Sequence, residues 1–197
     1  MKPLADQLSQ YASYHRDRRN IATHLVGVPM IVCGIEALLA RPALAAHGWT
    51  LSLALGSTLA AAGFYFALDR RYGVVMAALL GASLWVGTRI AALSTGAWLL
   101  AFAGLFVIGW VIQFAGHAVE GRKPAFVDDL VGLLIAPLFI VVEVGFALGL
   151  RDELRQELER RVGPTGGNPA KKHYVNSEQA IRGAAGPADP RHPQGPP

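Results

Sequence analysis

Residues 113–124 read QFAGHAVEGRKP and close a long apolar run that begins at Trp98. If this run is helical, Gln113, His117 and Glu120 stand at i, i+4 and i+7, and their side chains share one face. A glycine and a proline follow, and both residue types are typical of helix ends. Ionisable groups where an apolar helix reaches the membrane surface are candidates for a functional site. The alternative is that His117 and Glu120 only mark the polar end of a membrane helix.

The rest of the chain alternates between charged clusters and apolar runs. Of its 197 residues, 52% are hydrophobic and only 16% are charged, and the net charge is +4. Average proteins have about 25% charged residues. The apolar runs are long enough to cross a bilayer, so the sequence predicts a polytopic membrane protein. Basic and aromatic residues do not interleave as they do in RNA-binding proteins, and no nucleic-acid partner is expected. The charges gather at Met1–Asn20, Asp69–Arg71, Glu120–Asp129 and after Leu150.

Four of the apolar runs predict transmembrane helices, and an amphipathic segment precedes them. In that segment Leu4, Leu8, Tyr11 and His15 recur at helical spacing, which predicts a short helix on the membrane surface with His15 on its buried side. The four predicted spans are Ile21–Ala40, Trp49–Leu68, Tyr72–Leu93 and Ala97–Val119.

The fifth apolar run, Leu130–Leu150, is interrupted at Ala136–Pro137 and carries Glu143. It reads either as a kinked span or as a broken helix that turns back. Most basic residues outside the spans fall on the side of the N-terminus, which the positive-inside rule makes cytoplasmic. A straight fifth span would put the charged helix predicted at Arg151–Arg161 on the opposite side, so the charges favour a broken or re-entrant element.

The predicted fold is therefore an all-α, polytopic membrane helix bundle. It has four transmembrane helices, a broken or re-entrant fifth apolar element and the N-terminal amphipathic surface helix. Residues 1–162 are expected to form one membrane-embedded helical domain. Residues 163–197 are rich in glycine, proline and polar residues and are expected to be a disordered tail. Both termini are expected to be cytoplasmic.

A second polar cluster lies at the start of the first span, where Asn20 and His24 share a helix face at i, i+4. His15 does not share it, because nine residues of helix turn through about 180°. His15 and His24 converge only if the chain bends within Arg16–Asn20. His15, His24, His117 and Glu120 would then form one set of imidazole and carboxylate ligands. Such a set with open positions suits ferrous iron and oxygen, and zinc would fit nearly as well. The alternative is that the histidines cap or link helices.

Four motifs in this order resemble the Mpo-like family, whose characterised members are membrane 2-hydroxy fatty acid dioxygenases. The resemblance covers about Leu4 to Leu150, and only hydropathy connects its two ends. The motifs are Tyr14-His15-x4-Asn20-x3-His24-x4-Pro29, Gly109-Trp110-x2-Gln113-Phe114-x-Gly116-His117, Arg122-Lys123-Pro124-Ala125 with Asp128–Leu130, and Ala136-Pro137-x5-Glu143.

The resemblance implies Fe(II)-dependent α-oxidation, in which a long-chain 2-hydroxy fatty acid reacts with O2 and loses one carbon. Family histidines that match His15, His24 and His117 are the expected iron ligands. The family usually separates the histidine and glutamate of the third motif by three residues, whereas two residues separate His117 from Glu120 here. Both spacings keep the two side chains on one helix face, so Glu120 is still expected to be a ligand.

Other polar residues are expected to serve the reaction or the substrate. Asn20 and Gln113 would orient ligands or bind substrate. Arg122 or Lys123 would attract the fatty acid carboxylate, although membrane topology alone also explains these two cations. Glu143 would be a further inward substrate-binding group, and the acyl chain would enter from the bilayer. The expected location is an inner (plasma) or ER-type membrane, with the site on the cytoplasmic side.

Two readings from other classes remain open. One is a non-catalytic membrane transporter or scaffold whose histidines are structural, and the other is a zinc-dependent membrane hydrolase. Metal analysis of the purified protein separates the three, because iron, zinc or no metal would each indicate a different class.

Overall fold

The computed structural model describes residues 3–46, 49–121 and 131–166. Met1–Thr165 forms one compact unit, separate from Gly166–Pro197. The tail expected from residue 163 therefore lies mostly outside the described residues. Within the described part, the elements in chain order are α1 (Leu4–Ala12), α2 (Arg18–Ala40), β1 (Ala43–Ala46), β2 (Trp49–Ser52), α3 (Leu53–Leu68), α4 (Arg70–Ala91), α5 (Thr95–Glu120), α6 (Gly132–Ala147) and α7 (Asp152–Val162).

Three of the described helices, α2, α4 and α5, are long and apolar enough to cross a membrane. The number becomes four if α6 and α7, which are bent by 114° at a short break, count as one span. The helical fold predicted from hydropathy is thus confirmed, and three of the four predicted spans appear as candidate membrane-spanning helices at nearly their predicted positions. The full count of four spans plus a re-entrant element is not established.

The predicted span Trp49–Leu68 differs, because its first residues form a strand. Trp49–Ser52 pairs antiparallel with Ala43–Ala46 in a two-stranded hairpin, in which Ala43 lies opposite Ser52. Ser52 then caps α3, since its hydroxyl accepts a hydrogen bond from the backbone N–H of Leu55 at 3.2 Å. A serine that satisfies a free helical N–H favours a helix start at this position. The helix is consequently 16 residues long.

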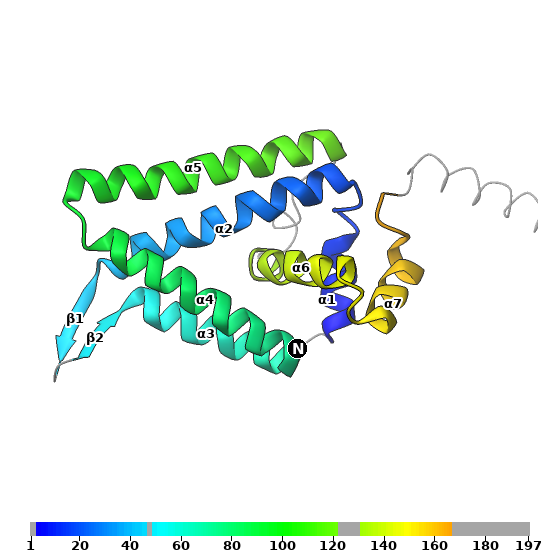
Figure 1. The fold of residues 1–197 in the computed structure, drawn as a ribbon, viewed down its shortest axis with the longest axis horizontal. Helices are drawn as coiled ribbons and strands as arrows, with labels where there is room; N and C mark the ends of the chain where they lie inside the picture. The colour runs from blue at the N-terminus through cyan, green and yellow to red at the C-terminus, as the bar shows by residue number, and fades with distance from the viewer. Residues whose placement is uncertain (1–2, 47–48, 122–130, 167–197) are drawn as a thin grey trace, which may run out of the picture. The chain divides into compact units, whose positions relative to one another are not determined.

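Helices α2, α3, α4 and α5 run side by side along the bundle (Figure 1). Helices α2 and α5 come close together where Gly27 and Gly109 face each other. A Cβ atom added at Gly27 would lie 2.9 Å from the carbonyl oxygen of Gly109, closer than real Cβ contacts come. The glycines therefore permit the near contact of the two helices that carry His24 and His117.

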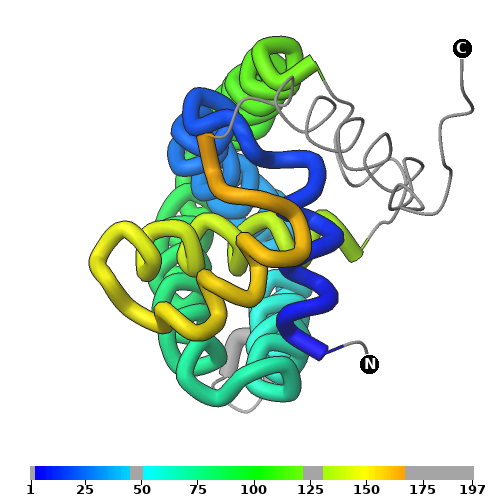
Figure 2. The backbone as a smooth tube through the Cα atoms, turned by 90° about the vertical axis from the view of Figure 1, so that its right-hand side faces the viewer, coloured from blue at the N-terminus to red at the C-terminus, as the bar shows by residue number. Residues whose placement is uncertain are grey.

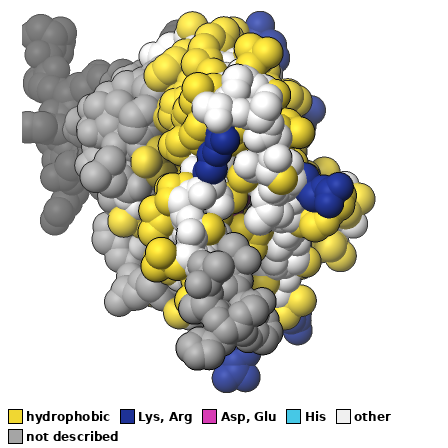
Figure 3. Space-filling view, turned by 90° about the vertical axis from the view of Figure 1, so that its left-hand side faces the viewer, with side chains coloured by type: hydrophobic (Ala, Val, Ile, Leu, Met, Phe, Trp, Pro, Cys, Tyr) yellow, Lys and Arg dark blue, Asp and Glu magenta, His cyan; other side chains and the backbone are white. Residues whose placement is uncertain are grey.

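Helices α1, α6 and α7 lie across one end of this bundle, and Figure 2 looks onto that end. Tyr11 of α1 packs on Phe139 of α6, with ring centroids 5.0 Å apart. The Tyr65 hydroxyl donates to the carbonyl oxygen of Leu134 at 2.7 Å. An ion pair of 2.9 Å joins Arg151 to Asp69, the residue between α3 and α4. Figure 3 shows the opposite end, where hydrophobic side chains surround a few Lys or Arg side chains.

The break in the fifth apolar run lies later than the sequence predicts. Helix α6 continues through Pro137, which lies near its start and does not end the helix. The chain turns instead after Ala147, where Gly149 has φ = 73° in the left-handed region. The N–H groups of Gly149 and Leu150 donate to the carbonyls of Phe146 and Gly145, the pairing of a Schellman helix end. The break therefore belongs at Leu148–Arg151, and the prediction at Ala136–Pro137 was wrong.

Candidate metal centre

Three histidines from three separate elements meet at the end of the bundle that α1, α6 and α7 cover. His15 lies in the link between α1 and α2, His24 on the second turn of α2 and His117 on the last turn of α5. One ring nitrogen from each lies within 4.8 Å of the other two. All three are buried, with exposed fractions of 0%, 2% and 7%. The structure therefore brings together the three histidines that the sequence analysis expected to converge.

A short link makes this convergence possible. Helix α1 ends at Ala12, and α2 begins at Arg18 after the N-cap residue Asp17. The Asp17 carboxylate accepts the backbone N–H of Arg19 at 2.8 Å, which satisfies one free donor at the helix start. The chain bends at His15–Asp17, at the beginning of the hinge predicted for Arg16–Asn20. The bend turns His15 back over the first turns of α2.

Backbone carbonyls determine which nitrogen of two of the rings carries the proton. The Nδ1 atom of His15 lies 2.9 Å from the carbonyl oxygen of Tyr11, and the Nδ1 atom of His24 lies 2.8 Å from that of Asn20. A carbonyl oxygen only accepts hydrogen bonds, so each Nδ1 is the N–H donor of its ring. In a neutral imidazole the Nε2 atom then holds a bare lone pair.

The two Nε2 atoms face each other at 3.1 Å. Burial, and next the charge of His24, lowers the pKa of His15 to about 2, so its ring is neutral at physiological pH. Two bare lone pairs at this distance repel each other unless a cation lies between them. Nitrogens that bind one metal ion at about 2.0–2.2 Å each are roughly 3 Å apart, which fits the observed separation. Three imidazoles suit iron, zinc or copper.

The ring of Tyr11 covers the outer side of the cluster. It stacks on His15 with centroids 4.2 Å apart and an interplanar angle of 4°. Tyr11 thus contributes its ring and its carbonyl oxygen to one ligand. The sequence analysis named Tyr11 only as part of the amphipathic stripe. Its i, i+4 spacing from His15 was the signal that could have placed it beside the site.

Glu120 lies at the end of α5 and outside the group of three histidines. Its carboxylate oxygens accept the backbone N–H groups of Arg16 and Asp17, both at 2.9 Å. They also accept the side-chain amide of Asn20 at 3.1 Å. The carboxylate therefore connects the end of α5 to the link that carries His15.

Asn20 and Gln113 are both buried beside the histidines, with 0% and 5% exposed. The Oδ1 atom of Asn20 and the Oε1 atom of Gln113 lack a hydrogen-bond donor among the residues that the structure describes. Gln113 packs closely on α2, because a Cβ at Gly27 would lie 3.1 Å from its Cγ. Two buried amide oxygens are thus available next to the cluster.

The remaining candidate residues lie apart from the histidines. Glu143 on α6 faces Arg16, with an oxygen 3.5 Å from the guanidinium. Arg16 also donates to the carbonyl oxygen of Gly163 at 2.7 Å. Arg122 and Lys123 lie outside the described residues, and their substrate role stays a prediction.

Comparison with known proteins gives one family match and one relative. The family described as 2-hydroxy-palmitic acid dioxygenase Mpo1-like matches residues 1–148, which include the three histidines. A relative from Saccharomyces cerevisiae, 2-hydroxy-palmitic acid dioxygenase MPO1, is 33% identical over 158 residues. That match covers 79% of this chain and 87% of the relative. No solved structure matches.

Proposed function

The chain belongs to the 2-hydroxy-palmitic acid dioxygenase Mpo1-like family, and from this premise we propose that it is a non-haem Fe(II) dioxygenase of a membrane. Its substrate would be a long-chain 2-hydroxy fatty acid, which it shortens by one carbon. The overall change balances with one O2: the shorter fatty acid forms, and the lost carbon leaves as CO2 together with one water. The proposed location is an inner (plasma) or ER-type membrane, with the site and both termini on the cytoplasmic side.

The observation that carries this proposal is the pair of Nε2 atoms of His15 and His24, 3.1 Å apart with both Nδ1 atoms bonded to carbonyls. A structural role for the histidines would not require two bare lone pairs to face each other. His117 adds a third imidazole to the pair. Iron held by these three residues would supply the oxygen chemistry that amino-acid side chains lack.

The chain's own groups would hold the ligands in place. The carbonyls of Tyr11 and Asn20 fix the tautomer and direction of two rings, as hydrogen-bond partners of metal-binding histidines generally do. We assign Glu120 to positioning, because its carboxylate fastens the link that carries His15. A further ligand bond from Glu120 would have to compete with the three N–H groups it already accepts.

The buried amide oxygens of Asn20 and Gln113 are placed to accept hydrogen bonds from the substrate or from water. Glu143 lies farther out, paired with Arg16, where the polar part of a substrate would pass. Arg122 and Lys123 would attract the carboxylate at the membrane surface. The burial of the three histidines keeps bulk water from the reacting atoms.

Metal content and product formation test the proposal together. Protein purified in detergent and loaded with Fe(II) without oxygen should bind iron, and with O2 it should convert a 2-hydroxy fatty acid to the acid one carbon shorter. His24→Ala should lose both iron and product. Zinc without oxidation would indicate a hydrolase, and no bound metal would indicate a scaffold or transporter. Bound iron without product across a range of chain lengths would refute the reaction.

A further inference from the structure

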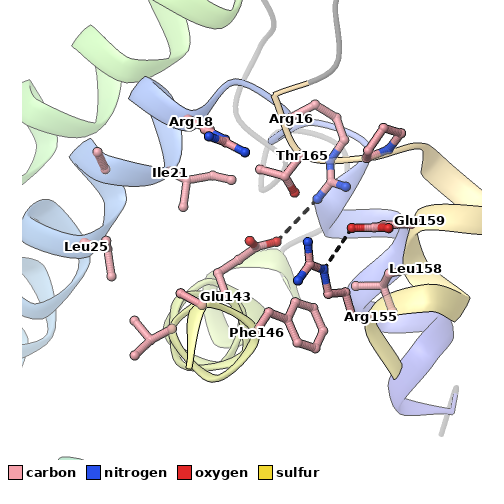
Figure 4. Close-up of a pocket in the computed structure, with 14 residues that line it drawn as sticks. Arg16, Arg18, Ile21, Leu25, Glu143, Phe146, Arg155, Leu158, Glu159 and Thr165 are labelled. Atoms are coloured by element: carbon pink, nitrogen blue, oxygen red, sulfur yellow. Dashed lines mark hydrogen bonds and ion pairs between the residues drawn. The ribbon is translucent and has the colours of Figure 1, made fainter. Parts of the chain in front are cut away.

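A separate pocket of about 510 Å³ lies between α2, α6 and α7 (Figure 4). Its volume falls within the range of roughly 300–1,000 Å³ that is typical of small-molecule sites. The pocket adjoins the metal centre through Arg16, which follows His15 directly in the chain and lines the pocket wall. The histidines themselves do not line it.

The polar end of the pocket has one cation more than it has anions. Its lining contains three arginines and two glutamates. Glu143 faces Arg16 at 3.5 Å, and Glu159 accepts from Arg155 at 3.0 Å, so each glutamate has an arginine partner. The third arginine, Arg18, has no hydrogen bond or ion pair among the residues that the structure describes. In Figure 4 it stands on the first turn of α2. An anion at this end would meet a guanidinium that has no competing carboxylate.

The opposite end of the pocket is apolar and continues onto the lipid-facing surface. Ile21, Leu25 and Val144 line it, and Leu25 and Val144 are 42% and 43% exposed. Leu25 lies seven residues after Arg18, which is about 10 Å deeper along the helix axis. The pocket therefore runs from a cation at the membrane surface to apolar side chains inside the bilayer. This is the charge and polarity pattern of a single-chain fatty acid lying in a membrane.

We propose that this pocket receives the long-chain acid from the bilayer, with its carboxylate on Arg18 and its proximal chain along Ile21, Leu25 and Val144. The inference rests on the proposed function for the identity of the acid, but its geometry is independent of the metal. It makes Arg18 a substrate-binding residue of a site outside the three histidines. The sequence analysis named Arg122 or Lys123 for this role instead.

Binding can be measured without turnover. The full-length, iron-loaded protein is placed in phosphatidylcholine nanodiscs without oxygen and exposed to a long-chain 2-hydroxy acid that carries a diazirine on its chain. Labelled peptides should come from α2 and α6. Arg18→Gln should reduce labelling by about tenfold, the scale of one lost charge-assisted contact. Ala22→Trp, which places an indole in the pocket at an exposed position, should block labelling.

Arg19→Gln is the matched control. Arg19 is the next residue, and its guanidinium pairs with Asp17 instead of lining the pocket. It should label like the wild type. Arg18→Gln should keep its bound iron and, if the enzyme turns over, raise KM with little change in kcat. Equal labelling of the Arg18 and Arg19 variants would overturn the inference, as would labels outside α2 and α6.

The acid and a lipid headgroup can be told apart in the same assay. Unlabelled 2-hydroxy acid should compete with the probe. Competition by phosphatidylglycerol in the nanodisc, without competition by the acid, would make the pocket a headgroup site and overturn the inference. Failure of the proposed function would appear differently, as correct labelling of α2 and α6 without a shortened product.

Discussion

Replacement of Gly116 by alanine should disrupt the contact between α2 and α5 at the metal centre. Gly116 directly precedes His117 on α5 and faces the turn of α2 that carries Asn20. A Cβ added there would overlap the Oγ1 atom of Thr23 and the Oδ1 atom of Asn20, and it would lie 3.2 Å from the Cβ atom of Thr23. Contacts this short force a shift, so either the Thr23 and Asn20 side chains move or the two helices separate locally. A separation would move His24 away from His117, and a shift at Asn20 would disturb the residue whose carbonyl oxygen holds the His24 ring.

The size of the effect follows from overpacking and from the site's geometry. Forcing one extra carbon into a packed interface costs about 1–3 kcal/mol. For a chain of this length, 1 kcal/mol lowers the unfolding midpoint by about 2–4 °C, so a fall of roughly 2–12 °C is expected. Bound iron should fall more steeply, because the pair of helices holds two of the three ligands. Thermal unfolding in detergent and metal analysis of the same sample measure both quantities.

Gly104→Ala is the control on the same helix. A Cβ at Gly104 meets no atom within 4 Å, so this variant should keep both its stability and its iron. The alanine at Gly104 also favours the helix slightly, by up to about 1 kcal/mol. If the Gly116 variant unfolds at the same temperature as the Gly104 variant and binds as much iron, the close contact of α2 and α5 does not determine the positions of the histidines.

Three further predictions concern Glu120, an ion pair and the membrane topology. Glu120→Ala leaves two backbone amides without their acceptor, so bound iron should fall several-fold. Glu120→Gln keeps one acceptor oxygen, so its iron content should lie between those of the wild type and the alanine variant. A Glu120→Ala variant with full iron content would contradict the proposed positioning role of Glu120. Burial raises the pKa of Asp69, but hydrogen bonds from Arg151 and two backbone amides outweigh it, and the net pKa is lowered. The ion pair therefore stabilises the fold above about pH 4, the pKa of an unfolded aspartate, and is lost as pH falls further. Asp69→Asn should cost about 1 kcal/mol or less at pH 7 and nothing in acid, as urea unfolding at both pH values would show. Reporter fusions at Asn20 and Gly163 should lie on the same side of the membrane, and opposite sides would make α6 and α7 a crossing span.

Hydropathy predicted the long helices because membrane spans leave a strong signal along the chain. The predicted runs Ile21–Ala40, Tyr72–Leu93 and Ala97–Val119 correspond to α2, α4 and α5. Hydropathy could not distinguish a strand from a helix at Trp49–Ser52, because it does not depend on the type of secondary structure. It also misplaced the break in the fifth run. Proline is the obvious helix breaker in a sequence, whereas the break actually depends on the left-handed conformation of Gly149, a residue type found throughout these helices.

The meeting of the histidines could be predicted only in part. Alternating spans place His24 and His117 at the same end of the bundle, and this follows from the sequence alone. The position of His15 depends on the length and direction of a short link, which the sequence limits but does not determine. The expected bend within Arg16–Asn20 overlaps the observed one, although α2 already begins at Arg18.

The hydrogen bonds of Glu120 show where spacing arguments stop. Its place three residues after His117 puts it on the histidine face, and a carboxylate on that face reads as a ligand. Its oxygens accept the side-chain amide of Asn20 and two main-chain amides about a hundred residues earlier in the chain. Main-chain amides leave no mark in a sequence, because every residue except proline has one. The change from a spacing of i+4 to i+3 would move a metal ligand measurably, but a flexible carboxylate can follow two adjacent amides. The altered spacing between His117 and Glu120 is therefore easier to reconcile with a positioning role for Glu120 than with a role as a metal ligand.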